Sequence, residues 1–184
     1  MLSRFRLRLA VSHLRGGGII AYPTEGVYGL GCNPLDQRAV LGLLELKERP
    51  TAKGLILIAA EFGQIEPYLD LPTEIMRDKI LATWPGPATW VIPAAGWVPA
   101  WLRGEHPTVA VRVTDHPVAA ALCRAFGGPI VSTSANRSGH PPARTPVSVR
   151  KHFSTEHLLL IPGRLGNLRG PTAVYDASTG ARLR

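Results

Sequence analysis

Short apolar runs of strand length alternate along this chain with stretches of helical periodicity, and clusters of Gly and Pro separate the two. This alternation constrains the fold strongly, because strands that alternate with helices form α/β domains. The late apolar runs have only short connections, which indicates a mixed sheet rather than a fully parallel one. Strands are predicted at residues 19–22, 55–60, 88–93, 108–113, 130–132, 158–161, 172–175 and 181–183, and helices before residue 16, at 37–48, near 61–69 and 73–83, at 117–126 and from 146 onward.

Local signals mark several helix ends. Asp36 and Thr145 are predicted N-caps, and Pro146 suits a first helical position because its φ is already fixed there. Glycines follow the first helix at 16–18 and the Ala-rich helix at 127–128, and they are predicted to end both. Residues 23–34 and 133–144 are rich in Gly, Pro and small polar residues, so both are predicted to be loops.

The chain has 184 residues, and 21 Lys and Arg against 13 Asp and Glu give a net charge of +8. This is the length of one ordinary domain, so we expect residues 1–184 to form a single domain. A basic domain usually binds anions such as nucleic acid or nucleotide phosphates. Two cysteines exclude a disulfide framework, and no apolar run reaches the length of a membrane span. We therefore expect a cytoplasmic protein that has no membrane association.

Most standard catalytic motifs are absent from the sequence. There is no G-x-x-x-x-G-K-[ST] phosphate loop, and the G-x-G at residues 29–31 lacks the third glycine of a dinucleotide site. No G-x-S-x-G elbow marks a serine hydrolase. The histidines and cysteines show no metal-ligand spacing, so no protein metal site is predicted.

Polar side chains instead gather at the predicted strand ends and on the adjoining loops. Ligands of α/β proteins bind at strand ends, and cations together with hydroxyls and loop amides suit a polyphosphate. Each residue also has a plainer interpretation: Lys47 and Arg49 are favoured at any helix C-terminus, and Arg112 could pair with Asp115 at the surface. The set comprises Thr24, Lys47, Arg49, Lys53, Thr89, Arg112, Ser132, Ser134 and Asn136.

Six segments in this order resemble the threonylcarbamoyl-AMP synthase family, also called YrdC-like, over essentially the whole chain. K-x-R-P and S-x-N together are the specific elements, and the match is to the short, single-domain bacterial form. The segments are A-Y-P-T-E at residues 21–25, Y-G-L-G at 28–31, L-K-E-R-P at 46–50, W-P-G-P-A-T at 84–89, A-V-R-V at 110–113 and S-T-S-A-N at 132–136.

The resemblance implies a twisted α/β sheet around a basic concave cavity. It also implies the synthesis of threonylcarbamoyl-AMP and pyrophosphate from L-threonine, bicarbonate or CO2 and ATP, with Mg²⁺ bridging phosphates. The product would pass to a downstream transferase complex that modifies adenosine 37 of tRNAs reading codons that start with A. No covalent enzyme intermediate is needed, because catalysis rests on positioning and charge stabilisation.

Site roles follow from the resemblance residue by residue. Lys47, Arg49, Ser134 and Asn136 match the catalytic K-x-R and S-x-N elements. The ATP-binding residues would be Arg49, Lys53, Thr89, Ser134 and Arg184, and the threonine-binding residues would be Thr24, Arg112, Ser132 and Thr172. Arg112 is assigned to the threonine carboxylate, since a guanidinium binds a carboxylate in bidentate fashion.

Two positions depart from the family pattern, and two other functions remain as alternatives. Gly26 stands where many members have a hydroxyl residue, and Ile58 stands where longer members often have a histidine. The net charge also fits a non-catalytic RNA- or tRNA-binding module, although no basic run is interleaved with aromatic residues. A relative that uses carbamoyl phosphate would carry zinc-finger cysteines, which this sequence lacks.

Overall fold

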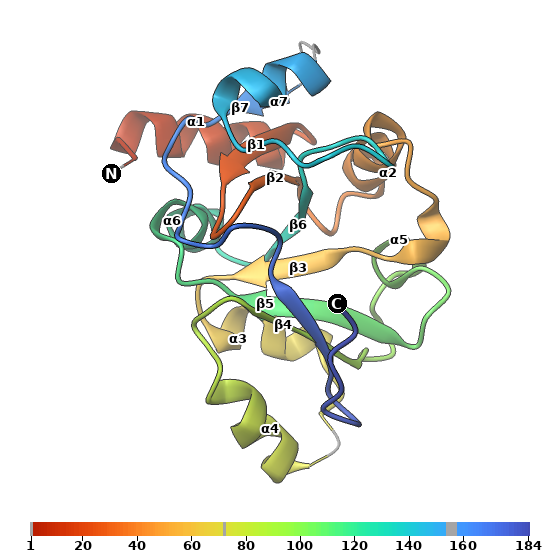
Figure 1. The fold of residues 1–184 in the computed structure, drawn as a ribbon. Coiled ribbons are helices and arrows are strands. Elements are labelled where there is room, and N and C mark those ends of the chain that lie inside the picture. Colours follow the sequence, from red (N-terminus) through yellow and green to blue (C-terminus); the bar gives the residue numbers. More distant parts are fainter. Residues whose placement is uncertain (1, 72, 154–157) are drawn as a thin grey trace.

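A computed structural model describes residues 2–71, 73–153 and 158–184. Its strands form one sheet in the order β7-β1-β2-β6-β3-β5-β4-β8, with helices on both faces (Figure 1). The strands are β1 (Ile19–Pro23), β2 (Tyr28–Gly31), β3 (Ile56–Ala59), β4 (Ala88–Pro93), β5 (Thr108–Val113), β6 (Ile130–Ser134), β7 (Leu158–Leu160) and β8 (Ala173–Asp176). The helices are α1 (Arg4–Arg15), α2 (Gln37–Leu46), α3 (Phe62–Ile65), α4 (Glu74–Leu81), α5 (Ala100–Arg103), α6 (Pro117–Phe126) and α7 (Pro146–His152), with 3-10 turns at Thr51–Lys53 and Glu66–Tyr68.

The sheet is mixed, as the sequence predicted. β1 pairs in parallel with β7, β3 with β5, and β4 with β8, whereas the other neighbouring strands are antiparallel. The α/β fold class is therefore confirmed.

Alternation along the strands places apolar side chains on both faces of the sheet. In β1, Ala21 packs in one core cluster, whereas Ile20 and Tyr22 pack in a second one with Ala10 and Leu14 of α1. The second cluster also contains buried residues of α6 and the strand residues Ile58 and Ile130. The helices α1 and α6 thus cover the face on which the even-numbered residues of β1 point.

The predicted helix caps are confirmed. The Asp36 carboxylate accepts hydrogen bonds from the backbone N–H groups of Arg38 and Ala39 at the start of α2. Thr145 forms a capping box with Ser148, and Pro146 is the first residue of α7. Gly127 ends α6 in the left-handed conformation that glycine adopts most easily.

Several predicted boundaries were wrong. Residues 28–31, taken as part of a loop, form β2, because glycines that weaken a strand in isolation allow this one to lie close to its neighbours. A Cβ on Gly31 would lie 2.5 Å from the carbonyl oxygen of Val131 in β6. β6 continues to Ser134 rather than ending at residue 132, so Ser134 lies on the strand with Ser132 and not in the predicted loop.

The remaining differences concern short elements. Residues 61–69 form the short helix α3 followed by a 3-10 turn, since Pro67 cannot donate to a continued helix. α5 was not predicted, because its four residues are too few to show a period. Residues 181–183 form only an isolated bridge between Arg182 and Tyr175 rather than a strand.

One connection has to cross the sheet. β7 and β8 are the two edge strands, and residues 161–172, called the crossing segment below, join them (blue in Figure 1). Gly166 and Leu168 of this segment donate backbone hydrogen bonds to the carbonyl oxygens of Thr24 and Glu25. Tyr28 donates a hydrogen bond from its hydroxyl to the carbonyl oxygen of Gly163. The crossing segment is thereby tied to the turn between β1 and β2.

None of the helices in the described ranges has both the length and the apolar character that a membrane crossing requires.

Two glycine substitutions should have opposite effects on stability. Gly31→Ala should lower the free energy of unfolding by about 1–3 kcal/mol, because the new methyl group meets the Val131 carbonyl in a packed sheet. Gly42→Ala should raise it by about 0.5–1 kcal/mol, because Gly42 lies inside α2 with open space around it. Urea unfolding measures both, and a Gly31→Ala variant as stable as the parent would contradict the close packing of β2 on β6.

Candidate functional site

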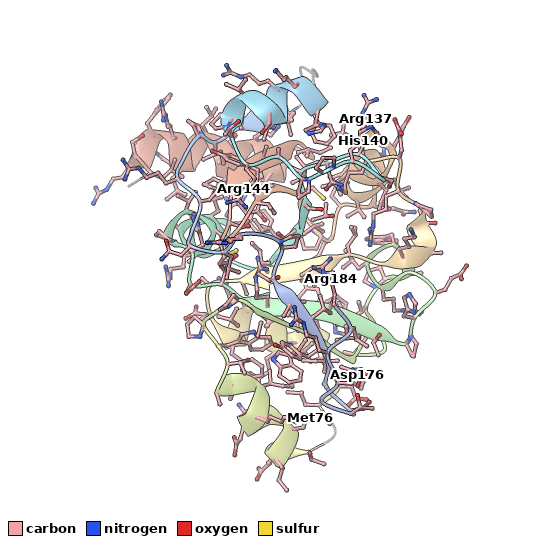
Figure 2. The ribbon with its side chains drawn as sticks, viewed as in Figure 1. Met76, Arg137, His140, Arg144, Asp176 and Arg184 are labelled. Atoms are coloured by element: carbon pink, nitrogen blue, oxygen red, sulfur yellow. The ribbon has the colours of Figure 1, made fainter. Side chains whose placement is uncertain are left out.

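A polar cleft of about 100 Å³ brings together predicted residues that are far apart in the sequence. It lies on the face of the sheet that α1 and α6 cover, called the α1/α6 face below. Ile130 of β6 packs in the core cluster on that face, and Ser132, two positions further along the strand, points to the same face. Arg184 lies over the middle of the sheet (Figure 2). The predicted residues that line the cleft are Thr24, Arg49, Arg112, Ser132, Ser134, Thr172 and Arg184.

Arg112 is buried on β5 and does not pair with Asp115. Its Nη2 lies 3.1 Å from Oε2 of Glu25, and each side chain is 6% exposed. Its Nη1 donates a hydrogen bond to the Thr172 hydroxyl at 2.6 Å. The interpretation of Arg112 as half of a surface pair was therefore wrong, because the strand register places it beside Ile58 in the sheet rather than in solvent.

Hydroxyl groups surround this guanidinium. Thr89 is fully buried, and its hydroxyl shares a hydrogen bond of 3.2 Å with that of Thr172. Thr89 therefore supports Thr172 and does not itself line the cleft. Tyr22 donates a hydrogen bond to the Ser132 hydroxyl at 2.9 Å, and burial raises the pKa of Tyr22. Since its oxygen accepts from Tyr22, Ser132 keeps its own proton free to donate to a ligand.

Lys47 is hydrogen-bonded to the backbone of the S-x-N segment. It caps the C-terminus of α2, and its ammonium donates hydrogen bonds to the backbone carbonyl oxygens of Ser134 and, at 2.7 Å, Asn136. Burial, with a smaller effect of Arg49, lowers the pKa of Lys47 to about 8. Lys47 thus holds the backbone that carries Ser134, whose hydroxyl donates to Oδ1 of Asn136 at 2.6 Å.

Arg49 and Arg184 add two further guanidinium groups. Glu48 has a positive φ of 54°, and this bend turns the chain after α2. Arg49 then donates from Nη2 to the carbonyl oxygen of Gly54 at 2.9 Å, and Arg184 donates from Nη2 to that of Thr172 at 3.2 Å. Burial lowers the pKa of both arginines, with smaller contributions from Arg184 on Arg49 and from Arg112 on Arg184.

The cleft is therefore an anion site by charge. The described residues that line it include three arginines and no Asp or Glu. Within the described ranges, no group of three or more His, Cys, Asp or Glu side chains is placed to hold a metal ion.

Lys53 lies outside the cleft. It is exposed on the 3-10 turn at Thr51–Lys53 and does not line the cleft. It lines an adjoining hollow of about 300 Å³ that shares Arg49, Leu55 and Ile56 with the cleft. Arg49 thus connects the two spaces.

Three residues around the site were not predicted from the sequence. Glu25 and Tyr22 stand beside Thr24 in the A-Y-P-T-E segment, and the need of a buried Arg112 for an acidic partner was the available signal. Arg144 donates from Nη1 to the carbonyl oxygens of Gly26 and Arg169, both at 2.7 Å, and so joins the β1–β2 turn to the crossing segment. Figure 2 labels this arginine.

The two departures from the family pattern also have a structural setting. A Cβ on Gly26 would lie 1.9 Å from the carbonyl oxygen of Gly170, so glycine is required where the crossing segment passes this turn. Ile58 is fully buried in the second core cluster and does not line the cleft.

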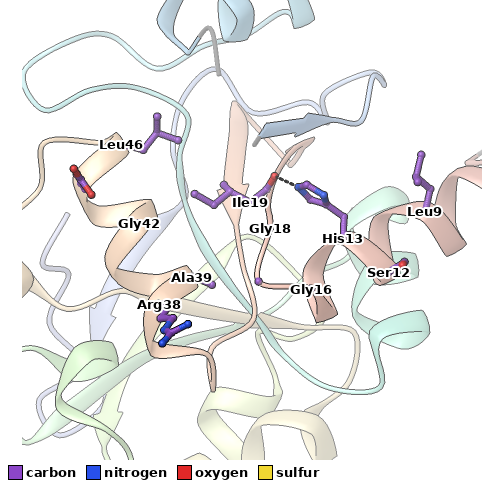
Figure 3. A pocket seen from close by; sticks show the side chains of 12 residues that line it. Leu9, Ser12, His13, Gly16, Gly18, Ile19, Arg38, Ala39, Gly42 and Leu46 are labelled. Carbon is purple, nitrogen blue, oxygen red and sulfur yellow. Dashed lines mark hydrogen bonds between the residues drawn. The ribbon is translucent and has the colours of Figure 1, made fainter. Parts of the chain in front are cut away.

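A larger hollow of about 840 Å³ lies elsewhere, between α1, the start of β1 and α2 (Figure 3). Its lining combines apolar side chains and the glycines at 16–18 with the polar residues Ser12, Arg38 and Glu45. His13 also lines it and hydrogen-bonds there with the carbonyl oxygen of Ile19. None of the predicted site residues lines it. Its size alone does not make it the candidate site, since the convergent polar groups lie in the cleft.

Comparisons with known proteins agree with the geometry. The family model Sua5/YciO/YrdC, described as "Telomere recombination", matches residues 12–183. A protein of Methylococcus capsulatus named threonylcarbamoyl-AMP synthase is 56% identical over 183 residues, which cover 100% of this chain and 98% of that protein. The protein of the same name from Escherichia coli K12 is 48% identical, with 100% and 97% covered.

A solved structure has the same fold. The crystal structure of P. abyssi Sua5 complexed with L-threonine superposes with a TM-score of 0.91 at 34% identity. The match covers 99% of this chain and 54% of that one, so the chain spans about half the length of this neighbour. Family model, relatives and structure all agree with the resemblance seen in the sequence, and the chain belongs to the Sua5/YciO/YrdC family.

Proposed function

We propose that this protein makes threonylcarbamoyl-AMP from L-threonine, bicarbonate or CO2 and ATP, as a nucleotidyltransferase formed by one catalytic domain over residues 1–184. The observation that carries the proposal is the cleft in which Arg49, Arg112 and Arg184 meet the hydroxyls of Ser132, Ser134 and Thr172. Relatives that match nearly the full chain have the corresponding name.

The reaction needs two anions to be held together. The threonine amine attacks carbon dioxide, or bicarbonate with loss of water, and forms a carbamate. A carbamate oxygen then attacks the α-phosphorus of ATP, the bond to the β-phosphate oxygen breaks, and pyrophosphate leaves. Both steps bring negative charges close to one another, so fixed cations and N–H groups that neutralise them lower the barrier.

The three arginines divide naturally between the two substrates. Arg112 lies deep in the sheet among hydroxyls and would bind the threonine carboxylate, with Thr24, Ser132 and Thr172 around the amino acid. Arg49 borders both the cleft and the adjoining hollow, and it would bind phosphates together with Arg184, with the phosphates extending toward Lys53. The cleft, at about 100 Å³, is smaller than the adjoining hollow of about 300 Å³, so the larger substrate would extend into the hollow.

Mg²⁺ accompanies ATP in the proposal without a protein cage. The described residues of the cleft provide hydroxyls but no carboxylate, so they do not form a dedicated Mg²⁺ site. The phosphates of ATP and water would hold the ion, whose chemistry is to neutralise phosphate charge.

The product is a reactive mixed anhydride, so a transferase complex that uses it must act downstream, and the tRNA would receive the threonylcarbamoyl group at adenosine 37. We expect the reaction to take place in the cytoplasm, where ATP and tRNA are both present. Contact with tRNA itself has only the net charge of +8 in its support.

The most direct test is a mass-spectrometric assay for threonylcarbamoyl-AMP that omits each substrate in turn, and product formed without threonine or without ATP would contradict the proposal.

Removal of Arg49 should impair the use of ATP. Arg49→Ala is expected to lower kcat/KM for ATP by about 100-fold, because a charge-assisted contact to phosphate is lost in a partly buried site. Arg38→Ala is the matched control, since Arg38 is exposed on α2 outside the cleft. Product formation measured by mass spectrometry should be normal in the control, and normal ATP use in Arg49→Ala would refute the assignment.

ATP affinity should fall as the pH rises through the pKa of Lys47, which is about 8. Near pH 7 Lys47 is mostly charged, and near pH 9 it is mostly neutral; the neutral amine still donates two hydrogen bonds, so the loop stays in place while one positive charge is lost. We expect affinity to fall by roughly threefold to tenfold across this range. ATP gains negative charge toward higher pH, so the titration of ATP itself would strengthen its binding and cannot explain a fall in affinity.

Calorimetric titration with ATP measures this dependence, and Lys47→Met is the informative variant. It should bind ATP more weakly, and its affinity should not fall over the same pH range. A wild-type affinity that stays constant, or a Lys47→Met variant that keeps the fall, would show that Lys47 does not supply the titrating charge.

A further inference from the structure

Glu25 is a buried acid that contacts Arg112 of the cleft but does not itself line the cleft. It is 5% exposed, and Oε2 lies 3.1 Å from Nη2 of Arg112. Oε1 accepts a hydrogen bond from the Thr114 hydroxyl at 2.5 Å. Oε1 is thus hydrogen-bonded, whereas Oε2 faces Arg112 in an ion pair without a hydrogen bond. Glu25 does not line the cleft, so the carboxylate is not placed to act on a ligand.

The contacts of Arg112 show what the acid does. A guanidinium is planar, so two anchored nitrogens fix the direction of all its N–H groups. Nη2 is held by the ion pair with Glu25, and Nη1 is held by the hydrogen bond to the Thr172 hydroxyl at 2.6 Å. Neither the buried Nε of Arg112 nor Oε2 of Glu25 has a hydrogen-bond partner among the described residues, so Glu25 acts on Arg112 through charge at short range. The direction of the N–H groups that remain for a ligand is therefore set by Glu25 together with Thr172.

Charge gives Glu25 a second effect. Arg49 and Arg184 line the same cleft, and no Asp or Glu lines it among the described residues. A third guanidinium buried next to them would be repelled and poorly solvated, and a buried charge is stable only when it is paired. Glu25 supplies that pair, so Arg112 keeps its place in the sheet before any anion binds.

We propose that Glu25 is a positioning residue that directs the Arg112 guanidinium and thereby determines how strongly the cleft recognises a ligand carboxylate. The inference rests on the proposed function, in which Arg112 binds the carboxylate of threonine. Glu25 itself contacts no substrate and transfers no proton.

The test compares two ligands that differ only in the carboxylate. L-threonine and L-threoninol, in which a CH2OH group replaces the carboxylate, are titrated into wild-type protein and into Glu25→Gln by calorimetry. The Kd for threoninol divided by the Kd for threonine measures carboxylate recognition. This ratio should fall by about tenfold in Glu25→Gln, because the guanidinium of Arg112 is no longer held in place. The Kd for ATP should change by less than about twofold, a split that a general loss of structure would not produce.

Two further variants complete the design. Glu66→Gln is the matched control, since Glu66 pairs with Arg77 at the surface, and it should leave the ratio unchanged. Thr114→Val removes one anchor of Glu25 but keeps its charge, and it should lower the ratio by about threefold. It carries the test if Glu25→Gln does not fold, which thermal unfolding will show.

The outcomes distinguish the proposed role of Arg112 from that of Glu25. If wild-type protein binds threonine and threoninol equally well, Arg112 does not recognise the carboxylate and its proposed role is wrong. If wild-type protein discriminates, and folded Glu25→Gln or Thr114→Val discriminates just as well, the role of Arg112 stands and that of Glu25 is refuted. A reduced ratio with unchanged ATP affinity supports the inference.

Discussion

The site exists because the chain must cross its own sheet. β7 and β8 are the edge strands, so the crossing segment has to pass over a face, and it does so where the α1/α6 layer ends. Its backbone hydrogen bonds to Thr24 and Glu25 bind it to the β1–β2 turn. Pro171 and Thr172 at its end, and Arg184 beyond β8, are thereby brought to a cleft whose other residues come from the first three quarters of the chain.

The cleft concentrates positive charge, and the fold must stabilise that charge in the absence of a ligand. Each cation has a fixed oxygen partner: Glu25 for Arg112, the Gly54 carbonyl for Arg49 and the Thr172 carbonyl for Arg184. Such partners hold the donors in place before an anion arrives, so little reorganisation is required when charge develops during a reaction. The shift of Lys47 to a lower pKa reflects the same crowding, since burial and Arg49 both disfavour its charged form.

The sequence allowed the α/β class, the mixed sheet and the strands β4 and β5 to be predicted with correct bounds, because long apolar runs between clear breakers decide them. It allowed half of the residues that line the cleft to be named, among them all three arginines, because their motifs resemble a family and ligands bind at strand ends. It did not reveal that Lys47 holds a loop or that Thr89 supports Thr172, since those facts depend on contacts between residues more than 80 positions apart. β2 was not predicted for a related reason. Its glycines lower the local preference for a strand, and they are needed only because β6 lies so close beside them.

The Gly26 departure shows how one position and a distant segment must fit together. A side chain at residue 26 and the carbonyl of Gly170 would occupy the same space, and a Cβ on Gly166 would also approach the carbonyl oxygen of Glu25 to 2.8 Å. A chain with a hydroxyl residue at 26 must therefore hold the crossing segment further from the β1–β2 turn. Here the glycine lets the segment close against the turn, and Arg144 bridges the carbonyls of Gly26 and Arg169 across the contact. The absent side chain thus affects the backbone close to the cleft, because Thr172, which accepts a hydrogen bond from Arg112, follows Gly170 by two residues.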